Sequence, residues 1–229
     1  MNSKIIAVVF LCVATGALPA SAADVGPGDR VIFSDDFSQE EIGAFPKQWT
    51  LKGPDGGGNT LSVASRNGSK FLFSETPQEG AEQTSSTAYA RLPKLKDLPE
   101  RFTIEFDAVL GYSRLVTDLR AEKQYDLRVG TGDSSFSMLS VTSERVISRN
   151  TQSELKLAVG QVHRVVVSVD AAFLKAYIDG QLVVSDPQGV VRPIDHIGME
   201  LSTYKSTRQD DLMFTRFRVT GAGEGAMAR

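Results

Sequence analysis

Residues 162–185 alternate apolar and polar side chains with the period of two that a strand shows when one of its faces is buried. In the first part of this segment, Val165, Val167 and Val169 fall on one face. The alternation resumes at residues 173–178, and Asp179-Gly180 then supplies the two positive-φ positions of a tight hairpin. The segment therefore predicts two linked hairpins, a β-meander, in a chain of antiparallel strands.

The rest of the chain has the same character, with short alternating runs, frequent turn sequences and little that follows a helical period. The clearest turns are Asn67-Gly68 and the glycine-rich residues 53–58. Many short strands with frequent turns indicate a β-sandwich or a barrel. Residues 111–123 carry no clear pattern and are expected to form a rim loop or one helical turn. We expect strands at residues 61–65, 69–74, 86–91, 101–109, 124–130, 135–142, 144–149, 153–158, 162–169, 173–179, 181–185, 195–204 and 211–219.

The hairpin sequence narrows the choice of fold. A valine-rich strand, a short turn and the run LKAYIDGQLV at residues 174–183 together resemble the late meander of laminin-G-like and other concanavalin A-type jelly rolls. The resemblance implies an all-β fold, a two-sheet antiparallel jelly-roll β-sandwich of the concanavalin A-like kind. In such a fold we expect the first and last strands to be adjacent.

Three further motifs give a second, more specific resemblance. PGDRVIFSDDFS at residues 27–38, IGAFPKQW at 42–49 and LPERFTIEFD at 98–107 are similar to the lectin-like domain that precedes the peptidoglycan-binding module in certain OmpA-type envelope proteins. The similarity extends over roughly residues 27–219 and implies a lectin-like domain. Residues 221–229 are small and are expected to form a flexible tail, without the OmpA-type module, so peptidoglycan binding is not carried over.

The N-terminus has the features of a secretory signal peptide. Lys4 precedes an apolar run at residues 5–11, and small residues precede an expected cleavage after Ala22. The apolar run is shorter than the roughly 20 residues that a membrane-spanning helix needs. Cys12 follows Leu11 instead of the small residue that a lipobox requires, so lipidation is not expected. We therefore expect a signal peptide at 1–22, one jelly-roll domain at 23–220, and a periplasmic or secreted protein.

Charge and cysteine content limit the partners and the chemistry. The chain has 25 basic and 28 acidic residues, a net charge of −3, and no cluster of basic residues that would suit nucleic acid or an anionic membrane. Its single cysteine lies in the expected signal peptide, so the mature domain is expected to contain no disulfide. The resemblance to a lectin-like domain implies a polysaccharide or envelope glycan as the partner.

Glu105 and Asp107 lie two residues apart in a predicted strand and so share one face. The same superfamily includes β-glucanases that use E-x-D-x-x-E on one strand, and a retaining glycosidase needs a carboxylate pair about 5–5.5 Å apart. Here the third position is Leu110, so the proton donor is missing and no catalytic residue is assigned. The pair is either a solvent-facing acidic strand or part of a carbohydrate-binding site.

Two acidic pairs, residues 35–36 and 210–211, lie near the two ends of the domain. Jelly rolls of this type often hold a structural Ca²⁺ with carboxylate and backbone oxygens there, which makes Asp36 and Asp211 candidate ligands. The alternative is that both are ordinary turn residues. His163 and His196 are the only histidines, which leaves little basis for a transition-metal site.

Alternation along other strands suggests a sugar-binding set on polar faces. Tyr177 and Tyr204 lie on such faces, Glu200 shares the face of Tyr204, and Arg128 is a nearby guanidinium candidate. Aromatic rings and polar groups of this kind bind pyranose faces and hydroxyls, although isolated surface tyrosines are also ordinary. By the same parity Tyr125 belongs to the core, and Trp49 is expected to pack under the N-terminal loop.

These observations favour an exported, non-catalytic carbohydrate-binding domain acting on envelope or extracellular glycan. A protein-interaction or structural envelope domain without a sugar site is the alternative, because one fold serves many functions. A glycoside hydrolase or polysaccharide lyase is the third possibility.

Overall fold

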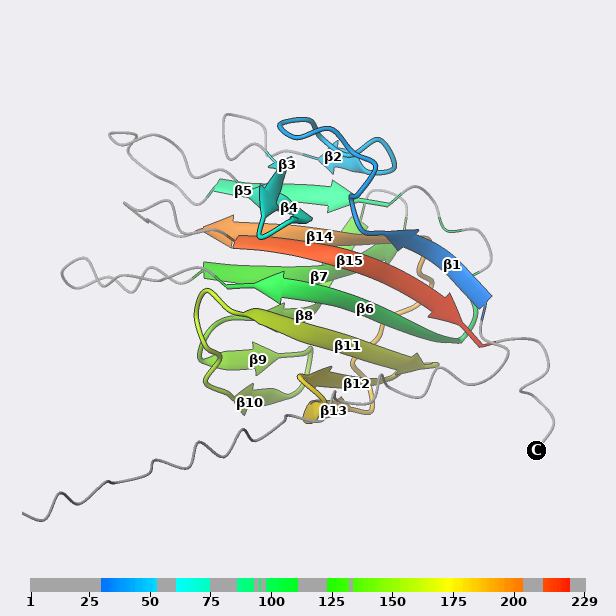
Figure 1. Ribbon diagram of the computed structural model, residues 1–229. Helices are drawn as coiled ribbons and strands as arrows, with labels where there is room; N and C mark the ends of the chain where they lie inside the picture. The colour runs from blue at the N-terminus through cyan, green and yellow to red at the C-terminus, as the bar shows by residue number, and fades with distance from the viewer. Residues whose placement is uncertain are drawn as a thin grey trace, which may run out of the picture.

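A computed structural model describes residues 30–52, 61–74, 86–92, 95, 98–110, 123–131, 134–203 and 212–222. These residues form strands, turns and connecting segments arranged in two layers (Figure 1). Among them, no helix has the length and apolar character needed to cross a membrane. The predicted segment 111–123 lies largely outside this part of the chain.

The first layer, here called sheet A, is antiparallel and has eight strands. Its order is β13 (Gln181–Asp186), β12 (Phe173–Ile178), β11 (Val162–Asp170), β6 (Arg101–Val109), β15 (Leu212–Gly221), β4 (Ser69–Ser74) and β3 (Leu61–Arg66). The eighth strand, β1 (Arg30–Asp35), pairs with β15. The predicted contact between the first and last strands is therefore confirmed.

The second layer, sheet B, has seven antiparallel strands. Its order is β10 (Gln152–Glu154), β9 (Arg145–Ile147), β8 (Ser134–Val141), β7 (Lys123–Thr131), β14 (His196–Thr203), β5 (Ser86–Arg91) and β2 (Thr50–Lys52). Each predicted strand has a counterpart, and β1 and β2 were not among the predicted ranges. The range 153–158 is wrong in extent, because regular pairing ends at Glu154 and the backbone of Leu155 and Leu157 bonds instead to the β8–β9 turn.

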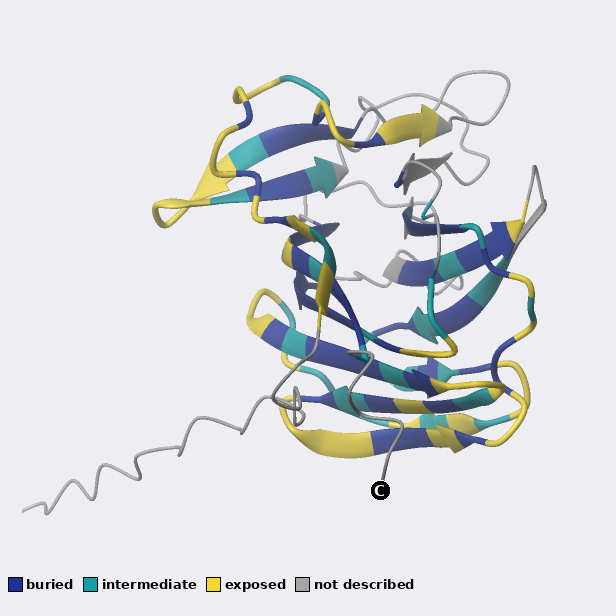
Figure 2. Ribbon diagram, turned by 90° about the vertical axis from the view of Figure 1, so that its right-hand side faces the viewer, coloured by how far each residue is buried: buried dark blue, intermediate teal, exposed yellow. Residues whose placement is uncertain are grey.

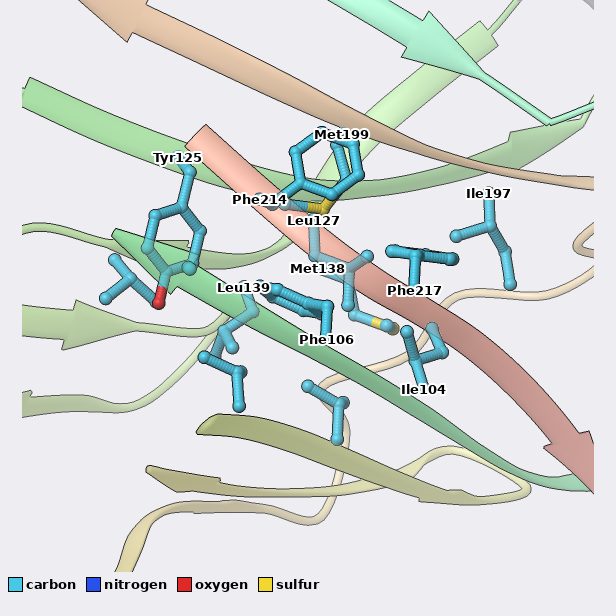
Figure 3. Close-up of a cluster of buried hydrophobic side chains, with 14 of the residues drawn as sticks. Ile104, Phe106, Tyr125, Leu127, Met138, Leu139, Ile197, Met199, Phe214 and Phe217 are labelled. Atoms are coloured by element: carbon cyan, nitrogen blue, oxygen red, sulfur yellow. The ribbon is translucent and has the colours of Figure 1, made fainter. Parts of the chain in front are cut away.

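The core lies between the two sheets. Buried side chains of β6 and β15 in sheet A, such as Phe106 and Phe217, point toward Leu127, Leu139 and Met199 of sheet B (Figure 3). Exposed segments gather at turns and strand ends, whereas both layers are largely buried along their length (Figure 2). The predicted core positions of Trp49 and Tyr125 are confirmed, with exposures of 5% and 1%.

A β-bulge in β15 breaks the simple alternation of that strand. Thr215 pairs with Asp107 and Arg218 pairs with Glu105, so two residues of β15 lie opposite the one residue of β6 between them. One of the two is Phe217, which enters the core and stacks on Phe106 at 5.8 Å. The other, Arg216, adopts φ +50° and remains exposed. The bulge therefore directs an arginine outward without removing a phenylalanine from the core.

Candidate functional site

The predicted sugar-binding residues do not form one site, because they belong to two different sheets. Glu105, Asp107 and Tyr177 lie on sheet A, whereas Arg128 and Glu200 lie on sheet B. In each strand the neighbouring positions are in the core, so these side chains project from the outer faces of the sandwich. Tyr204 is outside the described residues.

On the outer face of sheet B, Arg128 and Glu200 form an ion pair. Arg128 Nη1 lies 2.8 Å from Glu200 Oε2, and the two side chains are 23% and 18% exposed. Arg128 comes from β7 and Glu200 from the neighbouring β14, where Gly198 is the register partner of Arg128. Because Gly198 has no side chain, it leaves the diagonal between the two charged groups open. The pair is held by the sheet and still reaches solvent.

Asp126 adds a second carboxylate to this face, at the position opposite Glu200. Its side chain is only 4% exposed, and its Oδ1 accepts hydrogen bonds from Ser137 Oγ, at 2.8 Å, and from Ser140 Oγ. The two hydroxyl oxygens lie 2.9 Å apart. Sequence reasoning missed Asp126, although the core position of Tyr125 already implies that the next residue points outward.

We call Asp126, Arg128, Ser137, Ser140 and Glu200 the sheet B strip. Arg128 and Glu200 reach solvent from rigid strands, whereas Asp126 is buried and holds the two serine hydroxyls. Groups of this kind suit the hydroxyls of a sugar.

On the outer face of sheet A, the side chains of Glu105 and Asp107 are buried. Their exposures are 3% and 1%. The expectation of a solvent-facing acidic strand is therefore wrong. Arg164 on β11 binds both: its Nη2 donates to Glu105 Oε2 at 2.7 Å and its Nη1 to Asp107 Oδ1 at 3.4 Å. Arg216 binds the other oxygen of Asp107. Sequence patterns could not supply these partners, which come from two other strands.

Leu110 does not complete a catalytic triplet with this pair. It is 1% exposed and belongs to the core between the sheets, whereas the two carboxylates face outward. Tyr177 is half-buried on the same outer face as the carboxylates, two strands from Glu105, because Val166 pairs with both residues. The structure therefore places Tyr177 on the face of Glu105 and Asp107, and not on that of Arg128 and Glu200.

The described residues contain no group of three or more His, Cys, Asp and Glu side chains arranged to hold a metal. The Asp36 carboxylate accepts the backbone N–H of Ser38 at 2.9 Å. Hydrogen bonding from the Ser38 side chain, and after it from this N–H, lowers the pKa of Asp36. The Asp36 carbonyl oxygen accepts Thr215 Oγ1 at 3.3 Å, which places Asp36 beside β15. Asp211 is outside the described residues, so the calcium site stays a prediction.

Both histidines have carboxylate partners. His163 Nδ1 lies 2.7 Å from Asp179 Oδ2 and its Nε2 lies 2.8 Å from the Ala158 carbonyl oxygen. His196 Nδ1 lies 2.7 Å from Asp195 Oδ1. Both rings are buried, so these contacts tie neighbouring segments together inside the fold.

No protein-family model and no curated protein sequence matches the chain. Among solved structures, the metal-free carbohydrate recognition domain of Emp46p is similar, with 13% identity and a TM-score of 0.54, covering 82% of this chain and 95% of that one. A GlcNAcα1-4Gal-releasing endo-β-galactosidase from Clostridium perfringens has 14% identity and a TM-score of 0.55, covering 89% and 64%. An endo-β-1,4-glucuronan lyase from Trichoderma reesei has 11% identity and a TM-score of 0.54, covering 83% and 94%. These likenesses confirm the jelly-roll sandwich.

Proposed function

We propose that this chain is an exported, non-catalytic carbohydrate-binding domain that recognises an envelope or extracellular polysaccharide through the sheet B strip. The observation that carries the proposal is the ion pair between Arg128 and Glu200 beside the buried Asp126 carboxylate. The strands fix all three groups, so little side-chain entropy is lost when a sugar replaces water. A shallow row of donors and acceptors suits a chain of sugar units lying across the strands.

Three considerations support this choice of ligand class. The fold is one that sugar-binding domains use, as in the carbohydrate recognition domain of Emp46p, although enzymes such as the endo-β-galactosidase use it too. The sequence resembles the lectin-like domain of OmpA-type envelope proteins, and the N-terminus has the pattern of a signal peptide. Envelope glycan is therefore the ligand that best matches both the site and the expected location.

A glycan array with the full chain is the first test, followed by titration calorimetry with the best ligand. We expect Arg128→Ala and Glu200→Ala each to weaken binding about tenfold, the value of one hydrogen bond to a charged group. Arg101→Ala is the control, because Arg101 forms a similar ion pair with Asp170 on the other sheet. Binding that is unchanged in the strip variants would contradict the proposal, and so would an array without any ligand. Release of reducing sugar from a bound glycan would show an enzyme instead.

A further inference from the structure

One part of the outer face of sheet A carries more positive than negative charge, although the whole chain has a net charge of −3. Around the covered carboxylates of Glu105 and Asp107 lie three arginines, Arg164, Arg216 and Arg218. Three guanidiniums against two carboxylates leave a local charge of +1. We call these five residues the sheet A cluster.

The carboxylates form the inner layer of this cluster and the arginines the outer one. Glu105 and Asp107 are at most 3% exposed. The Arg164 side chain is 37% exposed and the Arg216 side chain 62% exposed, although both are ion-paired. Buried carboxylates that hold partly exposed guanidiniums act as anchors, because they fix the planes of the arginines and leave the other N–H groups directed to solvent.

The bulge in β15 provides the second arginine. In an unbroken strand, residue 216 would alternate to the core side of Thr215. The extra residue and the φ of +50° at Arg216 direct its side chain toward Asp107 on the outside. The positive φ at Arg216 is thus part of the bulge geometry that places both Phe214 and Phe217 in the core and leaves the Arg216 side chain on the outer face.

Arg218 lies next to this pair, opposite Glu105 in register. It is half-buried, and within the described part of the chain its guanidinium has no hydrogen bond or ion pair. Glu105 Oε1 is likewise a buried oxygen without a hydrogen-bond partner there. A guanidinium whose five donors are all available, beside two others that keep further N–H groups, can bind an anion.

We infer that the sheet A cluster is a second binding face, specific for an acidic polysaccharide whose repeating unit carries a carboxylate. The arginine fork matches a carboxylate in two-point geometry. Tyr177, partly exposed on the same face, lies two strands from Glu105, about 10 Å at the usual strand spacing, where its ring can pack on a neighbouring sugar. In this assignment Glu105 and Asp107 position the arginines, and the arginines contact the ligand. The inference goes beyond the polysaccharide binding proposed for the sheet B strip, because it assigns a second face and an acidic ligand.

Affinity electrophoresis with the full chain tests the inference, with polygalacturonate as the probe and its fully methyl-esterified form as the matched neutral polymer. We expect polygalacturonate to retard the wild type, the esterified polymer not to do so, and added salt to reduce the retardation. Arg216→Ala and Arg218→Ala should each weaken retardation about tenfold. Arg218→Ala keeps the test valid even where Arg216→Ala impairs folding, because Arg218 has no partner among the described residues.

Two further variants locate the ligand. Arg101→Ala removes an arginine of the same exposure, 61%, from the same face of β6 and should change retardation less than twofold. Arg128→Ala, in the sheet B strip, should leave the retardation by polygalacturonate intact, so failure of the proposed function and failure of this inference are distinguishable. Equal retardation by esterified polymer or by DNA would overturn the inference. So would loss of binding in Arg101→Ala or Arg128→Ala as large as in Arg216→Ala.

Discussion

The indole nitrogen of Trp49 donates a 2.9 Å hydrogen bond to the buried carboxylate of Asp35. The other oxygen of Asp35 accepts the backbone N–H of Phe37 at 2.8 Å. Trp49 in turn packs at 5.2 to 5.5 Å against Phe217 and Phe214 of the last strand. A single carboxylate therefore connects the end of β1 to the aromatic core, which is where the first and last parts of the domain meet.

We predict that Asp35→Ala lowers the free energy of unfolding by about 1–3 kcal/mol, because two buried donors lose their acceptor. Tryptophan fluorescence during urea unfolding reports the change directly. Asp36→Ala is the control, since that neighbouring carboxylate is exposed and bonds only within its own turn. An equal loss of unfolding free energy in the two variants would show that the buried hydrogen bonds of Asp35 do not stabilise the fold more than the exposed one of Asp36.

The pH dependence of Asp35 provides a separate test. Burial raises the pKa of this carboxyl above 3.8, more than its hydrogen bonds lower it. A carboxyl whose pKa is higher in the folded than in the unfolded state stabilises the fold while it is protonated. This stability is fully present below the pKa of the unfolded state and is lost as the pH rises through the pKa of the folded state. The stability difference between wild type and Asp35→Ala should therefore widen as pH falls toward 3.8, and a difference that narrows over this range would contradict the assignment.

The stability contributed by Asp186 should have the opposite pH dependence to that of Asp35. It is fully buried and accepts hydrogen bonds from Ser148 Oγ at 2.7 Å, from Asn150 and from the Gln188 N–H. Burial raises its pKa, but these hydrogen bonds together outweigh burial and hold the pKa below 3.8. Such a carboxylate contributes stability above 3.8 that is lost as pH falls through the folded-state pKa.

We therefore predict that Asp186→Ala lowers the free energy of unfolding by about 1–3 kcal/mol at neutral pH. This loss should become smaller below pH 3.8. Denaturant unfolding at several pH values measures both effects. Ser185→Ala, at the exposed position next to it, should change stability little. A cost that stays constant down to the lowest accessible pH would argue against an ionised, hydrogen-bonded Asp186.

The turn between β11 and β12 contains an alanine in the left-handed region, Ala171, at φ +53°. We predict that Ala171→Gly raises the free energy of unfolding by about 0.5–1 kcal/mol, because glycine has no Cβ to oppose this conformation. Ala172→Gly, one residue later and without a positive φ, should lower it by a similar amount through added chain entropy. Thermal unfolding of the two variants measures both changes. Changes in the free energy of unfolding with the same sign would contradict the left-handed conformation of Ala171.

The covered ion pairs of sheet A predict strong coupling between Arg164 and Glu105. Arg164→Ala should cost about 3 kcal/mol, because Glu105, which is 3% exposed in the wild type, then loses the guanidinium that pairs with it. Adding Glu105→Gln should recover part of that loss, which a double-mutant cycle measures. Arg101→Ala breaks a pair whose members are 61% and 56% exposed and should cost less than about 1 kcal/mol. Strict additivity of the two substitutions would contradict the coupling.

Calcium binding by Asp36 and Asp211 stays a prediction. If the site exists, calcium at a hundredfold excess over its Kd should stabilise the wild type by about 2.7 kcal/mol, and chelator should remove this effect. Asp211→Ala should melt at the same temperature with calcium and with chelator, while Asp170→Ala should respond like the wild type. Identical melting of the wild type in both conditions would show that Asp36 and Asp211 hold no calcium.

Much of the fold could be predicted because its signals are local. The alternation of Val165, Val167 and Val169 is a property of consecutive residues, and all three are buried in the core as expected. Asp179 and Gly180 have φ values of +50° and +81°, as the hairpin sequence indicates. The strands, the main turns and the inward or outward direction of most side chains were therefore determined by the sequence itself.

The grouping of the outward residues was decided by tertiary structure. Parity assigns Glu105, Tyr177, Arg128 and Glu200 to polar faces, but it does not say which strands lie side by side, and the sheet order places them on opposite sides of the sandwich. The burial of Glu105 and Asp107 depends on Arg164 and Arg216, which approach from two other strands. The bulge that turns Arg216 outward arises because Phe214 and Phe217 must both enter the core. Pairing and packing of this kind join residues far apart in the chain, so only the folded molecule determines which charges meet.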